Sequence, residues 1–91
     1  MRPGVAGRER SLMSVRVELS ILLRQYVPGY DENAGILVDY VEGKTIEHII
    51  AELRIPREKV IMVLVNQKPS KIGQRIQEGD SVRLAMVFGA G

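Results

Sequence analysis

Few side chains in this sequence of 91 residues could carry out chemistry by themselves. There is no cysteine, which excludes disulfides, thiolate catalysis, iron–sulfur clusters and cysteine-bound zinc. The single histidine, His48, cannot build a histidine-rich metal site alone, and a solvated surface residue is its simplest interpretation. These absences predict a chain that is not an enzyme and that uses no metal and no cofactor.

Two short motifs could suggest a reaction or a phosphate site, and each has a simpler explanation. Glu78 and Asp80 are carboxylates separated by one glycine, which is typical of a tight turn rather than an acid–base pair. Gly43-Lys44-Thr45 ends like a phosphate-binding loop, but that motif requires a glycine where this sequence has Val38. Thr45 is instead predicted to be a helix N-cap.

The charge distribution argues against two classes of partner. Residues 1–13 hold three arginines and one glutamate, whereas residues 14–91 hold ten basic and ten acidic side chains. No basic stripe of the kind that binds nucleic acid is visible. No apolar run reaches the ~18 residues that span a membrane, and the first residues lack the apolar core of a signal peptide. We therefore expect neither nucleic acid nor membrane as a partner, and a cytoplasmic protein.

The periodicity of apolar residues divides the chain into three parts. Residues 1–13 are rich in glycine and arginine without periodicity, which predicts a disordered N-terminal extension. Residues 14–88 carry strand and helix patterns and are predicted to form one small domain. Residues 89–91 are predicted to be a flexible C-terminal tail.

Apolar residues at alternating positions predict strands over residues 14–23, 36–41 and 81–88. One face of each strand is expected to lie in the core, with charged residues such as Arg16, Glu18, Asp39 and Arg83 on the other. The inward set comprises Val15, Val17, Leu19 and Ile21 from the first strand, Ile36, Val38 and Tyr40 from the second, and Val82, Leu84, Met86 and Phe88 from the last.

A short amphipathic helix is predicted between the second and third strands. Four apolar residues recur there at the i, i+3, i+4 and i+7 spacing of one helix face: Ile46, Ile49, Ile50 and Leu53. The residue before Pro56 disfavours helical geometry, so the helix is expected to stop there.

Residues 60–65 are apolar at every position and allow two interpretations. A strand covered on both faces has this pattern, and so does a strand with an exposed apolar face. In the second case, Ile61, Val63 and Val65 face the helix while Met62 and Leu64 face outward, or the two sets exchange faces. An exposed face of this kind usually marks a partner site. The predicted partner-binding patch consists of Met62, Leu64, Ala85, Val87 and Phe88; the alternatives are that residues 1–13 or a second copy cover it.

The order of elements is strand, strand, helix, strand, short connection, strand. One helix on one face of a mixed four- or five-stranded sheet buries all the apolar stripes. The predicted fold class is therefore α+β, with a β-grasp architecture.

Four segments in this order resemble the MoaD/ThiS family of ubiquitin-like sulfur carrier proteins over about residues 14–91. Gly43-Lys44-Thr45-Ile46 and Leu53-Arg54-Ile55-Pro56 are similar to the two ends of that family's helix segment. Val63-Leu64-Val65-Asn66 is similar to its central strand and turn, and Glu78-Gly79-Asp80-Ser81-Val82 to the turn before its last strand.

The resemblance implies a function for the C-terminal residues. In this family a partner adenylating enzyme activates the C-terminal glycine carboxylate, which becomes a thiocarboxylate. The sulfur then passes to an acceptor synthase subunit in molybdopterin, tungstopterin or thiamin biosynthesis. Gly91 would carry the sulfur, while Gly89 and Ala90 would thread the channel of the partner.

The sequence departs from the family at one position, because the family ends in Gly-Gly and this chain has Ala90. One added methyl group costs ~1–3 kcal/mol where a channel wall cannot move. The alternative function is therefore a non-conjugating ubiquitin-like module that binds other proteins and has lost the Gly-Gly end.

Overall fold

The structure is a computed structural model that describes residues 14–86. The predicted extension over residues 1–13 and the predicted tail over residues 89–91 lie outside the described residues, as do Val87 and Phe88. The elements, in chain order, are β1 (Ser14–Leu19), the 3-10 helix η1 (Ile21–Tyr26), β2 (Ile36–Asp39), α2 (Ile46–Glu52), the 3-10 helix η2 (Arg57–Lys59), β3 (Met62–Val65), β4 (Lys68–Pro69) and β5 (Ser81–Ala85).

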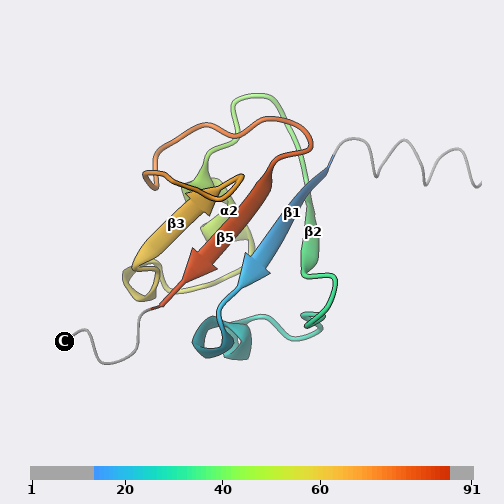
Figure 1. Cartoon of the computed structure of the whole chain (residues 1–91), viewed down its shortest axis with the longest axis vertical. Helices are drawn as coiled ribbons and strands as arrows, with labels where there is room; N and C mark the ends of the chain where they lie inside the picture. The colour runs from blue at the N-terminus through green and yellow to red at the C-terminus, as the bar shows by residue number, and fades with distance from the viewer. Residues whose placement is uncertain (1–13, 87–91) are drawn as a thin grey trace, which may run out of the picture.

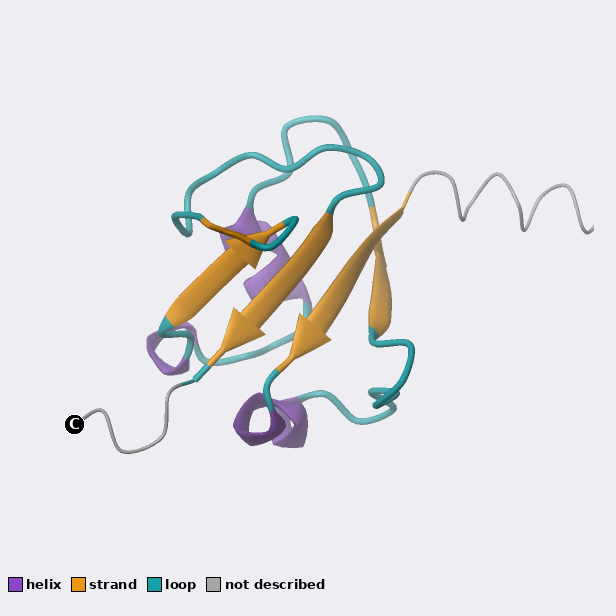
Figure 2. Ribbon diagram, in the orientation of Figure 1, coloured by secondary structure: helices purple, strands orange, loops and turns teal. Residues whose placement is uncertain are grey.

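The five strands form one mixed sheet in the order β2-β1-β5-β3-β4. The two central strands, β1 and β5, run parallel, and every other neighbouring pair is antiparallel. Helix α2 packs behind this sheet, and the other broad face carries no helix (Figure 1; Figure 2). The predicted α+β class and β-grasp architecture are confirmed, with five strands.

The core lies between the sheet and α2. Alternate residues of the strands point toward the helix, because successive side chains of a strand point to opposite faces. The predicted inward residues of the second and last strands are confirmed up to Met86, with Ile36, Tyr40 and Met86 half-buried at the margin; Phe88 lies outside the described residues. The buried strand residues are Val15, Val17, Leu19, Val38, Val63, Val65, Val82 and Leu84.

The first predicted strand is too long. The strand ends at Leu19, and Ile21 is 74% exposed instead of facing the core. The Ser20 amide donates to the Leu84 carbonyl (3.0 Å), and the chain then turns as the Leu23 amide donates to the Ser20 carbonyl (3.0 Å). The 3-10 geometry has three residues per turn, so Leu23, which is fully buried, takes the core position that alternation assigned to Ile21.

Helix α2 begins at the predicted N-cap. The Thr45 side chain accepts a hydrogen bond from the His48 amide (3.3 Å), and His48 Nδ1 accepts one from the Thr45 amide (3.0 Å). This reciprocal pair is a capping box in which histidine stands where Glu or Gln is usual. The helix ends before Pro56, with Leu53 half-buried as its C-cap. The rest of the predicted stripe is buried: Ile46, Ile49 and Ile50.

A two-residue turn after β3 creates a strand that the sequence pattern did not indicate. Asn66 and Gln67 both have positive φ, 52° and 69°, which is the geometry that closes a tight β-hairpin. The chain therefore reverses at once, and Lys68 pairs with Val65 while Pro69 pairs with Leu64. The connection that follows β3 thus includes the short edge strand β4.

Candidate functional site

The face of the sheet opposite α2 is called the open face below, and its main side chains are Arg16, Glu18, Met62, Leu64, Arg83 and Ala85. The pairing of β3 with β5 sets its register, placing Met62 opposite Ala85 and Leu64 opposite Arg83. Met62 is 44% exposed, and Leu64 and Ala85 are half-buried. No element between residues 14 and 86 covers this face (Figure 2).

The structure decides between the two interpretations of residues 60–65. The interpretation as a strand covered on both faces is wrong, because Val63 and Val65 are buried against the helix while Met62 is exposed. The prediction that Ile61 faces the helix together with Val63 is also wrong, since Ile61 is 59% exposed. It precedes β3 at the end of the sheet, where its amide donates to the Ala85 carbonyl (2.9 Å).

Three residues of the predicted partner-binding patch share the open face, and we call them the apolar patch: Met62, Leu64 and Ala85. The other two, Val87 and Phe88, lie outside the described residues. The structure also places an exposed leucine, Leu37, on this face, opposite Arg16 across β1 and β2. The role of the patch in binding stays a prediction, but its exposure on a face without a helix is what such a role requires.

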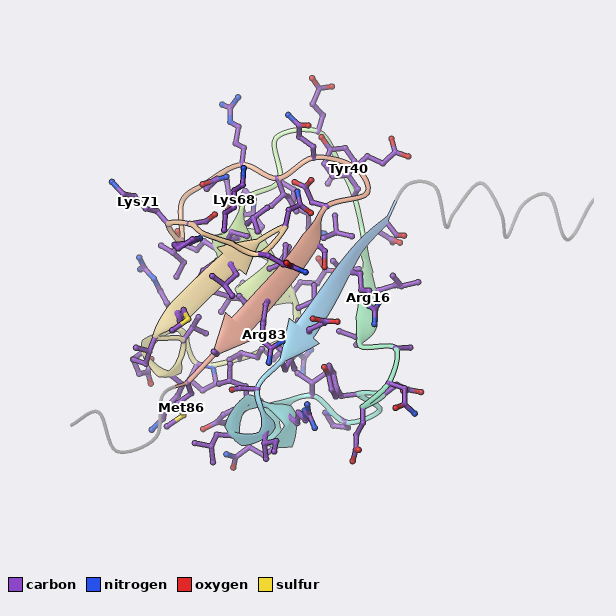
Figure 3. All side chains as sticks on the ribbon, viewed as in Figure 1. Arg16, Tyr40, Lys68, Lys71, Arg83 and Met86 are labelled. Atoms are coloured by element: carbon purple, nitrogen blue, oxygen red, sulfur yellow. The ribbon has the colours of Figure 1, made fainter. Side chains whose placement is uncertain are left out.

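Charged side chains from the two central strands meet beside the apolar patch. The parallel pairing of β1 and β5 puts Glu18 opposite Arg83. The Glu18 carboxylate lies 3.3 Å from an Arg16 nitrogen and 3.8 Å from an Arg83 nitrogen. Arg16 also donates to the Asn33 carbonyl (3.1 Å). Figure 3 views this face directly, with Arg83 near the centre and Arg16 toward β2.

The open face is hollowed where the charged and apolar residues meet. The hollow has a volume of about 400 Å³ and lies over β1, β5 and β3. Its walls combine two guanidinium groups, one carboxylate, one aliphatic side chain and small polar groups: Arg16, Arg83, Glu18, Leu64, Gln67 and Ser81. Alternation along each strand predicted that Arg16, Glu18 and Arg83 face solvent, but it did not predict that the three side chains meet around one hollow.

The turn that carries Glu78 and Asp80 is structural, as predicted. Gly79 has a φ of +84°, which side chains rarely adopt. Both Asp80 carboxylate oxygens accept hydrogen bonds, Oδ2 from the Gln77 amide (2.8 Å) and Oδ1 from the Asn66 side chain (3.0 Å). The Asp80 carboxylate therefore holds the turn together and links it to Asn66.

Lys44 has a role that the sequence motif did not reveal. It is only 7% exposed, and its Nζ donates to the Asp39 carbonyl and to Glu52 Oε1 (2.6 Å). The amine therefore ties the loop after β2 to the last residue of α2. Its donors are directed to protein oxygens rather than to a phosphate, which agrees with the sequence-based rejection of a phosphate-binding loop.

Within residues 14–86, no group of three or more His, Asp or Glu side chains is placed to hold a metal ion. No helix in this same part of the chain is long and apolar enough to cross a membrane.

Comparison with known proteins agrees with this geometry. No curated protein and no solved structure matches the chain. The model of one family, described as Mut7-C ubiquitin, matches residues 12–90 and so spans the whole sheet, α2 and the open face. This match supports the ubiquitin-like class, while it does not single out the MoaD/ThiS family. The chain belongs to the Mut7-C ubiquitin family.

Proposed function

We propose that the chain is a non-catalytic ubiquitin-like module that docks on a partner protein through its open face. One observation carries this proposal. The strand register gathers Met62, Leu64 and Ala85 into an apolar patch on the one broad sheet face that the described residues leave uncovered. Exposed apolar side chains that adjoin charged groups are the usual anatomy of a protein-binding surface.

The composition of the apolar patch suits recognition of another protein. Met62 has an unbranched, polarizable side chain that adapts to different partner surfaces. Around it, Arg83 and Glu18 supply a polar margin that sets orientation. The described residues provide no metal cluster, and both oxygens of the Asp80 carboxylate accept hydrogen bonds within the turn, so binding is better supported than catalysis.

The test places a photo-crosslinking amino acid at position 62, or at position 41 as a control, in cells that naturally make the protein. The crosslinked partner is identified by mass spectrometry and the binary complex is rebuilt from purified proteins. Met62→Asp should weaken this complex at least tenfold, because a carboxylate would be forced into an apolar contact. Val41→Asp changes an equally apolar, exposed residue of the loop after β2 and should leave the affinity unchanged. Equal affinities of both variants and wild type would contradict the proposal.

A second candidate function, sulfur carriage at Gly91, is favoured by the segments that resemble the MoaD/ThiS family. The Thr45 cap and the turn at Glu78–Ser81 belong to two of those segments. In addition, β5 pairs Ala85 with Met62, so a partner on the open face would contact the strand that leads toward Gly91. The docking module and the carrier would thus share one surface and differ in whether the C-terminal carboxylate reacts.

The carrier function is tested by incubating the full chain with the candidate adenylating enzyme, ATP and a sulfur donor. Adenylation should release pyrophosphate, and attack of the sulfur donor on the acyl carbon should then expel AMP together with one carboxylate oxygen of Gly91. Sulfur thus replaces that oxygen, and intact-mass spectrometry detects the change directly. Ala90→Gly gives the chain the Gly-Gly end of the MoaD/ThiS family and should react faster than wild type, since glycine lacks the extra methyl group. If deletion of residues 89–91 leaves every function of the chain intact, the carrier function is excluded and the docking module remains.

A further inference from the structure

The two arginines of the open face restrict what kind of partner can cover it. A guanidinium group has five N–H donors and no acceptor. Arg16 directs donors to Glu18 (3.3 Å) and to the Asn33 carbonyl (3.1 Å). Arg83 is 56% exposed, and its one ion pair within residues 14–86 is the long contact of 3.8 Å with Glu18. Most donors of Arg83 therefore remain in contact with water.

Covering this face would remove that water. An arginine that loses hydration without gaining acceptors is strongly unfavourable, whereas a close carboxylate partner compensates for the loss. The hollow holds two guanidinium groups and only one carboxylate, Glu18, which already lies between Arg16 and Arg83. One positive charge is left unbalanced at the point where a docked partner would exclude water.

We propose that the partner of the open face is a protein segment that presents an acidic side chain to Arg83 and an aliphatic side chain to the apolar patch. This inference rests on the proposed docking function and names the chemistry of the partner. The carboxylate of the segment enters the hollow and pairs with the free donors of Arg83. The aliphatic side chain lies on Met62 and Ala85.

The strand register sets the spacing that the partner must match. Arg83 lies opposite Leu64, and the pair of Ala85 with Met62 lies two residues away, after Arg83 on β5 and before Leu64 on the antiparallel β3. Two residues of a strand span ~6.6 Å, so the acidic and aliphatic groups must be separated by about that distance. Positions i and i+2 of an extended segment provide it, as do positions i and i+4 of a helix, which rise ~6 Å.

The same site is poorly suited to nucleic acid. A nucleic acid needs a row of cations for successive phosphates, and the hollow offers only two, Arg16 and Arg83. The neighbouring positions are taken by Leu64 and Met62, which offer aliphatic contact instead of further cations. An acidic side chain with an adjacent aliphatic one matches both halves of the surface.

The experiment selects binders from a phage-displayed library of random linear peptides against the full chain. Peptides that lose binding to Met62→Asp are retained, because they use the apolar patch. Among these, Asp or Glu should occur at the stated spacing from Leu, Ile, Val or Met. Their affinity should fall at least tenfold on Arg83→Glu, and exchanging the peptide's acid for lysine should restore binding to that variant.

Two controls keep the result interpretable. Arg83→Gln removes the charge without placing a second carboxylate opposite Glu18, and should weaken the same peptides to a smaller extent. Arg75→Glu makes the same charge reversal at an exposed residue of the connection between β4 and β5, and should leave their affinity unchanged. The dispersion of amide resonances verifies that each variant is folded.

The outcomes separate the inference from the docking function. Patch-dependent peptides without acidic residues, or with equal affinity for wild type and Arg83→Glu, would overturn the inference and leave docking in place. A library that yields no Met62-dependent peptide would contradict both. Binding of a single-stranded RNA or DNA oligonucleotide through Arg83, tighter than that of any acidic peptide, would also overturn the inference.

Discussion

The ammonium group of Lys44 lies 2.6 Å from the Glu52 carboxylate, and the two residues differ sharply in their exposure to solvent. Lys44 is almost completely buried, whereas the Glu52 side chain is about half exposed. The lysine also donates to the Asp39 carbonyl at the end of β2. The pair therefore connects β2 to the end of α2, and most of its contribution to stability should reside in the lysine.

Replacing Lys44 should destabilise the fold more than replacing its partner. In Lys44→Ala the Asp39 carbonyl and Glu52 both lose their donor, which should lower the free energy of unfolding by ~1–3 kcal/mol. In Glu52→Gln the half-exposed carboxylate becomes an amide that still accepts a hydrogen bond, and the loss should stay below ~1 kcal/mol. Urea denaturation of both variants checks the order, and a larger loss in Glu52→Gln would contradict it.

The capping box at the start of α2 predicts a graded series at position 48. His48→Ala removes the Nδ1 acceptor of the Thr45 amide and should lower stability by ~0.5–1 kcal/mol. His48→Glu keeps an acceptor and adds a negative charge at the helix N-terminus, so it should be at least as stable as wild type. Thr45→Ala removes the other half of the box and should cost ~1 kcal/mol. Thermal unfolding of the three variants measures the series.

Gly35 is a position where only glycine fits. Its φ is +74°, and an added Cβ would lie 2.7 Å from the Val17 carbonyl oxygen in the centre of β1. Gly35→Ala should therefore destabilise the fold by ~1–3 kcal/mol or more, through strain and a backbone clash.

Two other glycines separate those two effects. Gly29 also has positive φ, but no atom lies within 4 Å of an added Cβ, so Gly29→Ala should show the strain alone. Gly73 has neither constraint, and Gly73→Ala should be neutral or stabilising by up to ~1 kcal/mol. A Gly35→Ala variant no less stable than Gly29→Ala would contradict the predicted clash.

Asp31 should contribute a pH-dependent part of the stability. The backbone N–H groups of Ala34 and Asn33 donate to its carboxylate (2.9 and 2.7 Å) and hold the pKa of Asp31 below its ordinary 3.8. A pKa lowered by folding means that the ionised form favours the folded state. This stabilisation is therefore complete above the ordinary pKa and disappears as the pH falls through the lowered one.

The measurement for Asp31 combines NMR with a substitution. The pH titration of its carboxyl carbon should have a lower midpoint in the folded chain than in the urea-unfolded chain. Asp31→Asn keeps a side-chain oxygen that accepts the same hydrogen bonds but does not titrate, so stability should depend less on pH between ~2 and 5 than in wild type. Equal midpoints in the folded and unfolded chains would show that the loop does not favour the carboxylate.

The parts of the fold predicted from sequence are those governed by local periodicity. The spacing of Ile46, Ile49 and Ile50 identified the buried side of α2, and alternation identified Val15 and Val17 as core residues. Ile21 was misplaced because alternation continues in the sequence past the point where the Ser20 amide turns toward Leu84. That turn depends on a residue in another strand, so no local pattern contains it.

The candidate site was predicted only in its apolar half. Met62 and Ala85 could be assigned to one face because alternation applies within each strand. The convergence of Glu18 with Arg83 requires β1 to lie parallel to β5, and this pairing joins segments from opposite ends of the described chain. The role of Lys44 was missed for a related reason, since Glu52 and the Asp39 carbonyl reach it from two different elements.

The central position of β5 also has a consequence for how the protein is made. Without Ser81–Ala85, the remaining strands would form two separate pairs, β1 with β2 and β3 with β4, each with its inner edge unpaired. During synthesis the nascent chain cannot complete its sheet until this late segment has left the ribosome. Until then the unpaired edges of β1 and β3, which contain Val17 and Val63, would be open to proteases and to pairing with other chains.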